Sequence, residues 1–156
     1  MVMVRALTLL IALLLPGVAF ANQAVSLSSE IFLEKSVADS NGKTRIVLTE
    51  PKIVTPGDKL IFFLSYHNKS TAPAANFTVT NPMPGAVAYQ GTNDPAAQMS
   101  VDGGKNWGTL PSLSVRETDG SLRNARVEDV THVRWTMRTA IPAGAQGKLS
   151  FRGVVR

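Results

Sequence analysis

The chain contains no cysteine. This absence excludes disulfide bonds, a thiol nucleophile and a lipid-modified N-terminal cysteine. The stability of the protein therefore has to come from an apolar core alone. A chain of 156 residues is long enough to build one domain around such a core.

Charge and catalytic signatures are also sparse. Charged residues make up 17% of the chain, the net charge is +5, and no block of five like charges occurs. Aromatic residues are not interleaved with a cluster of Lys and Arg, as they are in nucleic-acid grooves. No Gly-x-Ser-x-Gly segment is present. We therefore expect no nucleic-acid partner, no cofactor and no enzyme activity.

The sequence has one long apolar run, residues 6–15, and Arg5 precedes it. Ala19 and Ala21 flank Phe20 in the small-x-small pattern of a leader cleavage site. The run is about half of the ~20 residues that a membrane-spanning helix needs. Residues 1–21 are thus predicted to be a secretory signal peptide. Residues 22–156 are predicted to be a single soluble domain without a transmembrane segment, located in the periplasm or outside the cell.

Alternation of apolar and polar residues with a period of two dominates the rest of the chain, and turn residues such as Asn41-Gly42 interrupt it. This pattern predicts an all-β, immunoglobulin-like antiparallel β-sandwich of about 7–9 strands. Residues 111–130 are polar and irregular, with a helical turn expected in 121–130. The expected strands are 31–38, 45–48, 59–68, 76–81, 86–90, 99–102, 131–138 and 148–155.

The core is predicted from the apolar face of each strand. In the strongest strand, 59–68, one face is wholly apolar, whereas the other begins apolar and ends polar. We expect the second face to be covered at one end only. The predicted core consists of Leu60, Phe62, Leu64, Tyr66, Phe77, Val79, Val133, Trp135, Met137, Leu149 and Phe151.

Four turn and strand-end features carry a family resemblance: Pro56-Gly57-Asp58, Asn68, Pro84-Gly85 and Pro142-Ala143-Gly144. With them, residues 53–155 resemble the conserved repeat domain of bacterial surface proteins, catalogued as domain of unknown function eleven. The resemblance implies an immunoglobulin-like sandwich exported to the envelope, with no established activity. Asn81 stands where the family usually has Asp, and the domain occurs here once, whereas the family is often tandem.

The segment SVDGGKNW matches the Asp-box of sialidases and other sugar-handling propellers through Ser100, Asp102, Gly104 and Trp107. A propeller needs four or more blades, and one copy of the motif cannot supply them. Asp102 can instead accept hydrogen bonds from the amides that follow it, while the glycines permit positive φ. We therefore interpret these four residues as a structural turn.

Other candidate sites are weaker. His67 and His132 fall on outward faces and could be cross-strand neighbours, but no third metal ligand is spaced to join them. The loops TNDPAAQ and ETDGS carry too few oxygen ligands for calcium. Six acidic residues stand in or near turns, where short carboxylates cap backbone groups: Asp58, Asp94, Asp102, Asp119, Glu128 and Asp129.

Arg134 and Arg138 share one face of the strand 131–138, and Arg152 joins them if the last strand pairs with that strand. Such a stripe could hold an acidic polysaccharide or an anionic lipid head group. A solvated face whose charges prevent edge-to-edge pairing explains the arginines more simply.

From the sequence we expect an exported, non-catalytic β-sandwich with a structural, binding or assembly role at the bacterial cell envelope, where its partner is a protein or a polysaccharide. Two alternatives stay open. One is a protein that binds or processes carbohydrate, suggested by the Asp-box-like hairpin, and the other is a surface domain that binds calcium or another metal.

The signal peptide yields the first prediction. When the full sequence is expressed in a bacterial host with a working export pathway, we expect the purified protein to begin at Asn22, because signal peptidase cleaves after Ala-x-Ala. Intact-mass spectrometry measures the product directly. A protein that keeps residues 1–21 after export would contradict the assignment.

Overall fold

The computed structural model describes residues 25–156, so the predicted signal peptide lies outside the described residues. The described chain forms ten strands and two short 3-10 helices. The elements, in chain order, are β1 (Val25–Ala38), β2 (Thr44–Thr49), β3 (Lys59–Asn68), β4 (Thr78–Pro82), β5 (Val87–Gly91), β6 (Ala97–Ser100), η1 (Leu110–Ser112), β7 (Ser114–Arg116), β8 (Leu122–Asn124), η2 (Val127–Asp129), β9 (His132–Thr136) and β10 (Gln146–Val155).

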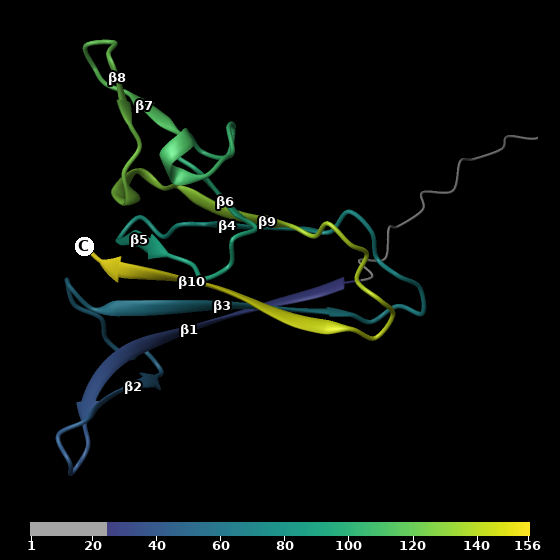
Figure 1. Cartoon of the computed structure of the whole chain (residues 1–156), viewed down its shortest axis with the longest axis horizontal. Coiled ribbons are helices and arrows are strands. Elements are labelled where there is room, and N and C mark those ends of the chain that lie inside the picture. The colour runs from purple at the N-terminus through teal and green to yellow at the C-terminus, as the bar shows by residue number, and fades with distance from the viewer. Residues whose placement is uncertain (1–24) are drawn as a thin grey trace, which may run out of the picture.

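The strands form an antiparallel β-sandwich, as predicted (Figure 1). The larger sheet has the order β2-β1-β3-β10-β5, and the smaller one has the order β4-β9-β6. A separate hairpin, β7-β8, raises the number of strands above the expected 7–9. The expectation was too low because β7 and β8 have only three residues each, too few to produce a readable alternation.

β3 is the central strand of the larger sheet and pairs along its length with β1 on one side and β10 on the other. Its even-numbered side chains face the smaller sheet. At the pair Tyr66–Gly147 the tyrosine ring lies over the glycine, and a Cβ at position 147 would come within 2.2 Å of the Tyr66 hydroxyl. Glycine is therefore required there for close approach rather than for an unusual φ.

The core lies between the sheets and contains all eleven predicted residues. Phe62 and Phe151 stack with ring centroids 4.5 Å apart, and Trp135 from the smaller sheet packs against Phe151 at 6.2 Å. Val79 and Val133 are fully buried beside them. Eight of the predicted residues are buried, whereas Tyr66, Phe77 and Met137 are partly buried at the margin of the cluster.

The smaller sheet is too narrow to cover the larger one. On the inner face of β1, Leu27 and Ile31 stand beside the core residues Tyr66 and Phe62 of β3. Leu27 nevertheless keeps 48% of its surface exposed and Ile31 keeps 40%. Leu27 and Ile31 therefore belong to the larger sheet without being part of the dry interior.

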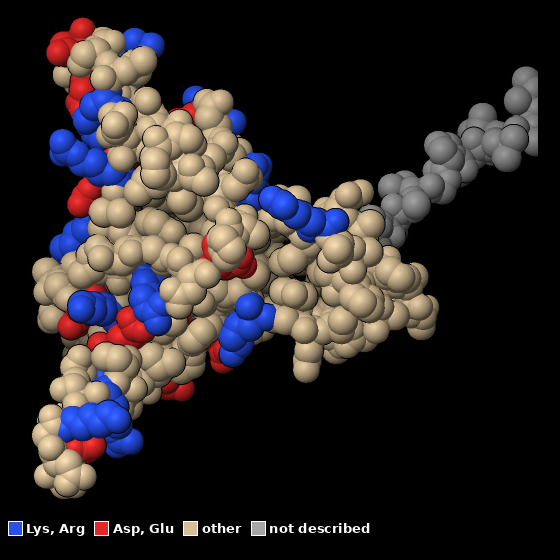
Figure 2. All heavy atoms as spheres, in the orientation of Figure 1, with Lys and Arg blue, Asp and Glu red and all other residues tan. Residues whose placement is uncertain are grey.

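Two hairpins project from the sandwich, β1-β2 on one side and β7-β8 on the other (Figure 1). Figure 2 shows Lys and Arg interspersed with Asp and Glu over both of them. Arg123 of β8 pairs with Glu117 and, by two hydrogen bonds of 2.6 and 2.8 Å, with Asp129. These bonds and the Arg126 N–H lower the pKa of Asp129 from 3.8 to about 2. The projecting β7-β8 hairpin is thus tied to η2.

Asn68, at the end of β3, is a fully buried polar side chain. Its amide nitrogen donates to the carbonyls of Ala72 (2.9 Å), Ile141 (2.9 Å) and Pro142 (3.1 Å). Its amide oxygen accepts from the N–H and the hydroxyl of Ser70, at 3.1 and 2.7 Å. One side chain therefore holds together the loop that leaves β3 and the loop that enters β10.

Asn68 gives the second prediction. We expect Asn68→Ala to lower the free energy of unfolding by about 2–3 kcal/mol, measured by urea denaturation, because buried carbonyls lose a donor. The loss stays in this range because Ile141 O and Pro142 O keep backbone donors in Ala74 and Ala145. Asn81→Ala is the matched control, since its amide donates only to the neighbouring Pro82 carbonyl, and about 0.5 kcal/mol or less is expected.

Asn68→Asp adds a pH dependence with a definite sign. The new carboxyl faces carbonyl oxygens, so its folded-state pKa rises above the unfolded value of about 3.9. The variant is then most stable below that value and loses stability as the pH rises through the folded-state pKa. Urea midpoints at acid and neutral pH that shift in the opposite direction, relative to wild type, would contradict the assigned contacts.

Candidate functional site

The Asp-box-like segment lies between β6 and η1 and closes on itself. Asp102 Oδ1 accepts hydrogen bonds from the Ser100 hydroxyl (2.7 Å) and from the amides of Lys105 (3.1 Å) and Asn106 (3.0 Å). Its Oδ2 accepts from the Asn106 side chain at 2.6 Å. These bonds, with those of the Asn106 backbone the largest cause, hold the pKa of Asp102 far below its ordinary value.

The remaining motif residues complete the same turn. The Ser100 hydroxyl accepts from the Gly104 N–H at 2.9 Å, and the Trp107 indole donates to the Gly104 carbonyl at 2.9 Å. Gly103 and Gly104 have φ of +77° and +87°, which a side chain would disfavour. All four motif residues therefore have partners within their own turn, as a structural role requires.

Trp107 also fixes the outer face of the smaller sheet. The Arg134 guanidinium lies 4.2 Å from the centre of its ring, and His132 meets the ring edge-on at 6.2 Å. Arg134 further donates to the Gln98 side chain at 2.6 Å. Its guanidinium is thus contacted by Gln98 of the neighbouring strand β6 and by Trp107 of the turn that follows β6.

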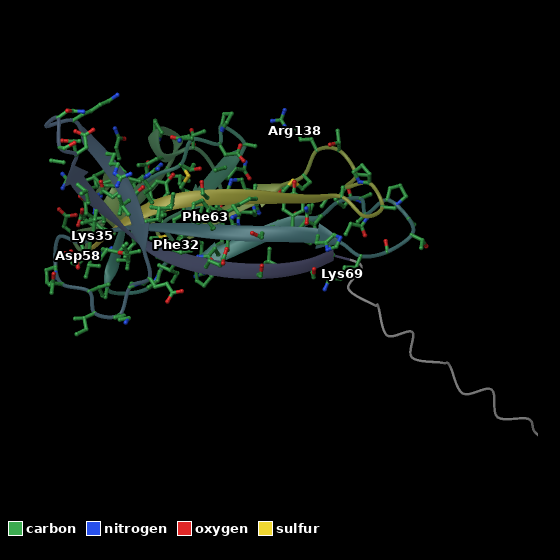
Figure 3. All side chains as sticks on the ribbon, turned by 90° about the horizontal axis from the view of Figure 1, so that it is seen from below. Phe32, Lys35, Asp58, Phe63, Lys69 and Arg138 are labelled. Carbon is green, nitrogen blue, oxygen red and sulfur yellow. The ribbon has the colours of Figure 1, made fainter. Side chains whose placement is uncertain are left out.

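The three arginines proposed as an anion-binding stripe do not form one face. Arg134 belongs to β9 of the smaller sheet, whereas Arg152 belongs to β10 of the larger one. β10 pairs with β3 and β5 rather than with β9. Arg152 is paired with Glu34 at 3.0 Å, and Arg138 is exposed beyond the end of β9, away from the Phe32–Phe63 pair (Figure 3).

The two histidines are likewise separated. His67 lies on β3 and His132 on β9, in different sheets, so the expected cross-strand pair is not found. Within residues 25–156, no three His, Asp or Glu side chains gather as a metal site would require. In the two loops considered for calcium, Asp94 accepts from the Ala96 N–H and Asp119 from the Ser121 N–H, each at 2.9 Å. These carboxylates cap turns, as expected from their positions.

A polar trough runs across the outer face of the larger sheet, at the end of β3 near Asn68. Two rows of side chains line it, and each row runs across the strands, with one residue from β1, one from β3 and one from β10. Its volume is about 700 Å³. We call it the outer trough, lined by the outward-facing Ser26, Ser28, Ser65, His67, Gln146 and Lys148, by Lys69 after β3, and by Leu27, Tyr66 and Gly147 of the inward-facing row between them.

The outer trough is cationic, because two lysines and no carboxylate are among the described residues that line it. Lys148 extends over the ring of Phe63, with Nζ 4.7 Å from the ring centre. Phe63 packs edge-on against Phe32 at 5.9 Å, and Lys69 lies just beyond the end of β3 (Figure 3). The ion pairs of the described chain use Arg123 and Arg152, which leaves both trough lysines available to a ligand.

The outward face of β3 is apolar at one end and polar at the other, and this difference sets where the trough ends. Ile61 of β3 points outward but is buried, under Phe32 and the Arg152–Glu34 pair on the neighbouring strands. Farther along the strand the outward residues are Ser65 and His67, which are half-buried. The apolar end of the face is therefore covered and the polar end is open, as the sequence pattern predicted.

Sequence reasoning did not identify the outer trough, although it identified the alternation that creates it. The trough depends on β1 and β10 flanking β3, and the order of strands in a sheet is not readable from their separate patterns. Comparisons of the chain with known proteins found no matching family model, no matching curated protein and no matching solved structure. Within residues 25–156 no helix is long and apolar enough to cross a membrane.

The turn gives the third prediction. We expect Asp102→Ala to speed hydrogen exchange at the amides of Lys105 and Asn106 by about tenfold or more, because both lose their acceptor. Mass-spectrometric or NMR exchange measures this. Asp119→Ala, in a different capped turn, is the control and leaves these two amides unchanged. Equal exchange in wild type and Asp102→Ala would show that the carboxylate does not hold the turn.

Proposed function

We propose that the chain is an exported, non-catalytic binding module of the bacterial cell envelope, and that the outer trough holds an acidic polysaccharide. The observation that carries the proposal is the composition of the trough, in which serine hydroxyls, a glutamine amide and two lysines line one open cleft without a carboxylate. The resemblance to the conserved repeat domain of surface proteins and the predicted signal peptide support the same location.

The chemistry of the lining fits this class of ligand. Hydroxyl and amide groups exchange hydrogen bonds with sugar hydroxyls, and an ammonium group pairs with carboxylate, sulfate or phosphate substituents. The volume of the trough, about 700 Å³, is within the range of about 300–1,000 Å³ typical of ligand sites. A trough that is open along the strands can accept a segment of a longer chain.

The position of the site favours binding without a large rearrangement. All of its lining side chains except that of Lys69, which follows the last residue of β3, stand on three adjacent strands of one sheet, with β3 bonded on both sides. A paired central strand has little freedom to move, so the lining is already arranged before a ligand arrives. The Asp-box-like turn, by contrast, uses its polar groups internally, which supports a binding function over carbohydrate processing at that turn.

The fourth prediction tests the trough with heparin as a sulfated polysaccharide and dextran as an uncharged one. We expect the exported wild-type protein to bind heparin but not dextran in isothermal titration calorimetry. The double variant Lys69→Glu and Lys148→Glu should weaken heparin binding by about tenfold or more, because two attractive charges become repulsive.

The matched control makes the same charge change outside the trough. Lys35→Glu with Lys105→Glu alters two exposed lysines on β1 and in the Asp102 turn. If binding responded only to net charge, the two double variants would weaken it equally, and the trough would be the wrong site. Equal binding of heparin by the wild type and the Lys69/Lys148 variant would also refute the proposal.

A further inference from the structure

The first half of β1 is an open edge of the larger sheet. Residues 25–33 pair with β3 on one side. On the other side, β2 pairs only with the segment from Leu33 to Ala38. Within the described chain, residues 25–32 therefore have no neighbouring strand on the side away from β3 (Figure 1).

The direction of the backbone groups along this edge follows from Asn68. The Asn68 N–H donates to Ala145 O, and its C=O accepts from the Gly144 N–H, so both groups point to the β10 side of β3. Backbone groups alternate in direction along a strand, so the next residue, His67, points toward β1. Its partner Ser26 therefore bonds to β3.

The same alternation continues along β1. The even-numbered residues of its first half bond to β3, and the odd-numbered ones turn their N–H and C=O groups to the open side. The residues that present unused backbone groups are thus Val25, Leu27, Ser29 and Ile31. Leu27 and Ile31 also carry the exposed aliphatic side chains of the uncovered inner face.

This edge lacks the features that usually prevent strand pairing. Between Val25 and Phe32 the sequence VSLSSEIF contains no proline and no lysine, and Glu30 is its only charge. Sheet edges are commonly protected by such residues, by a bulge or by a covering segment. The outer edge of β2 includes Arg45, and β4 ends at Pro82. The open half of β1 is suited to receive a further strand.

We propose that the occupant is a second copy of this chain, whose β1 pairs antiparallel with the first copy's β1 about a two-fold axis at Ser29. Inner faces stay on the same side of the joined sheet only if odd-numbered residues pair with odd-numbered ones. Pairing odd-numbered residues with odd-numbered ones also sets the unused N–H and C=O groups of the two copies opposite each other. The edge is therefore complementary to itself, as a two-fold interface requires.

The register at Ser29 is selected by the side chains. It places Leu27 of one copy opposite Ile31 of the other, so that four half-exposed aliphatic side chains cover one another. It places Glu30 opposite Ser28, a neutral partner. An axis at Glu30 would instead set the two carboxylates directly opposite, which is unfavourable. An axis at Ser28 would place Leu27 opposite Ser29.

The pairing would add about six main-chain hydrogen bonds, since each of the three bonded pairs between Leu27 and Ile31 supplies two. Val25 adds no such pair, because it would stand opposite Leu33, which already pairs with Thr49 of β2. It goes beyond the proposed polysaccharide binding and does not depend on it. Both outer troughs would lie on the same side of the joined sheet, because the axis is perpendicular to it. A long polymer could then contact two sites on one dimer, which raises the effective affinity without any new contact.

A single cysteine tests the axis directly, because the natural chain contains none. In a dimer of Ser29→Cys, the Cα atoms of the two substituted residues would be about 5.5 Å apart, a distance that a disulfide can bridge. We expect mild oxidation of the exported protein to give a covalent dimer on non-reducing gels. Ser36→Cys is the control, since it lies beyond the open edge and should not cross-link. Failure of Ser29→Cys to cross-link, or equal cross-linking of both variants, overturns the proposal.

Analytical ultracentrifugation of the exported wild-type protein provides the independent measurement, and dimers are expected at about 100 μM. Ser29→Pro removes a donor that faces the open side and leaves the bonds to β3 intact. It should raise the dissociation constant by about tenfold or more while the urea midpoint stays near that of wild type. A wild-type monomer at this concentration overturns the proposal.

A second pair of variants separates this edge from the rest of the exposed apolar surface. Ile31→Lys places a charge in the interface, whereas Ile46→Lys makes the same change on the outer face of β2, where Ile46 is 59% exposed. We expect the first to dissociate the dimer and the second to leave it unchanged. The reverse result would place the interface on β2 and overturn the assignment to β1.

Discussion

The constraint on which this structure depends is the unequal width of its two sheets. A sheet of three short strands covers one of five strands, in which β1, β3 and β10 are at least ten residues long. The stacked rings of Phe62 and Phe151 with the indole of Trp135 mark where the layers meet. The smaller layer covers side chains of β3, β10 and the edge strand β5, but it leaves Leu27 and Ile31 of β1 largely exposed. The bare part of the inner face of β1 and its free edge follow from that surplus of sheet, whereas the outer trough lies on the face turned away from the smaller sheet.

A chain without cysteine fastens its loops with polar contacts, of which that of Asn68 is fully buried. Asn68 reaches two loops that are far apart in the sequence, and its backbone bonds continue the attachment. The turn at Asp102 and the pair formed by Arg123 and Asp129 act in the same way at other places. Each contact costs desolvation, and each recovers that cost because every donor meets an acceptor at close to ordinary hydrogen-bond geometry.

The sequence allowed the strand type, the core and the turns to be predicted wherever the signal was local. β3 was predicted with its observed bounds, since aromatic and aliphatic residues alternate along all of it. The first six residues of β1 were missed because serines interrupt the apolar pattern, and pairing with β3 holds them in the strand. The β7-β8 hairpin was missed for a related reason, as Arg123 and its carboxylate partners stabilise strands too short to form a pattern.

The site was harder to predict than the fold. The Asp-box-like turn was recognised as structural because its donors and acceptors lie within a few residues of one another. The residues of the outer trough come from strands that long segments of sequence separate. The predicted arginine stripe was wrong for the same reason, since Arg134 and Arg152 lie in different sheets. Local periodicity shows which way a side chain points, but the order of strands in the sheet decides which other side chains lie next to it.

The placement of β1 and β10 on either side of β3 has a mechanical consequence. β1 and β10 run parallel to each other, because both are antiparallel to β3. The described chain begins on β1 and ends just after β10, at opposite ends of β3 (Figure 1). A force that pulls Val25 and Arg156 apart therefore loads the hydrogen bonds of both ladders in shear, all at once, instead of opening them one after another. Such an arrangement resists stretching along its length.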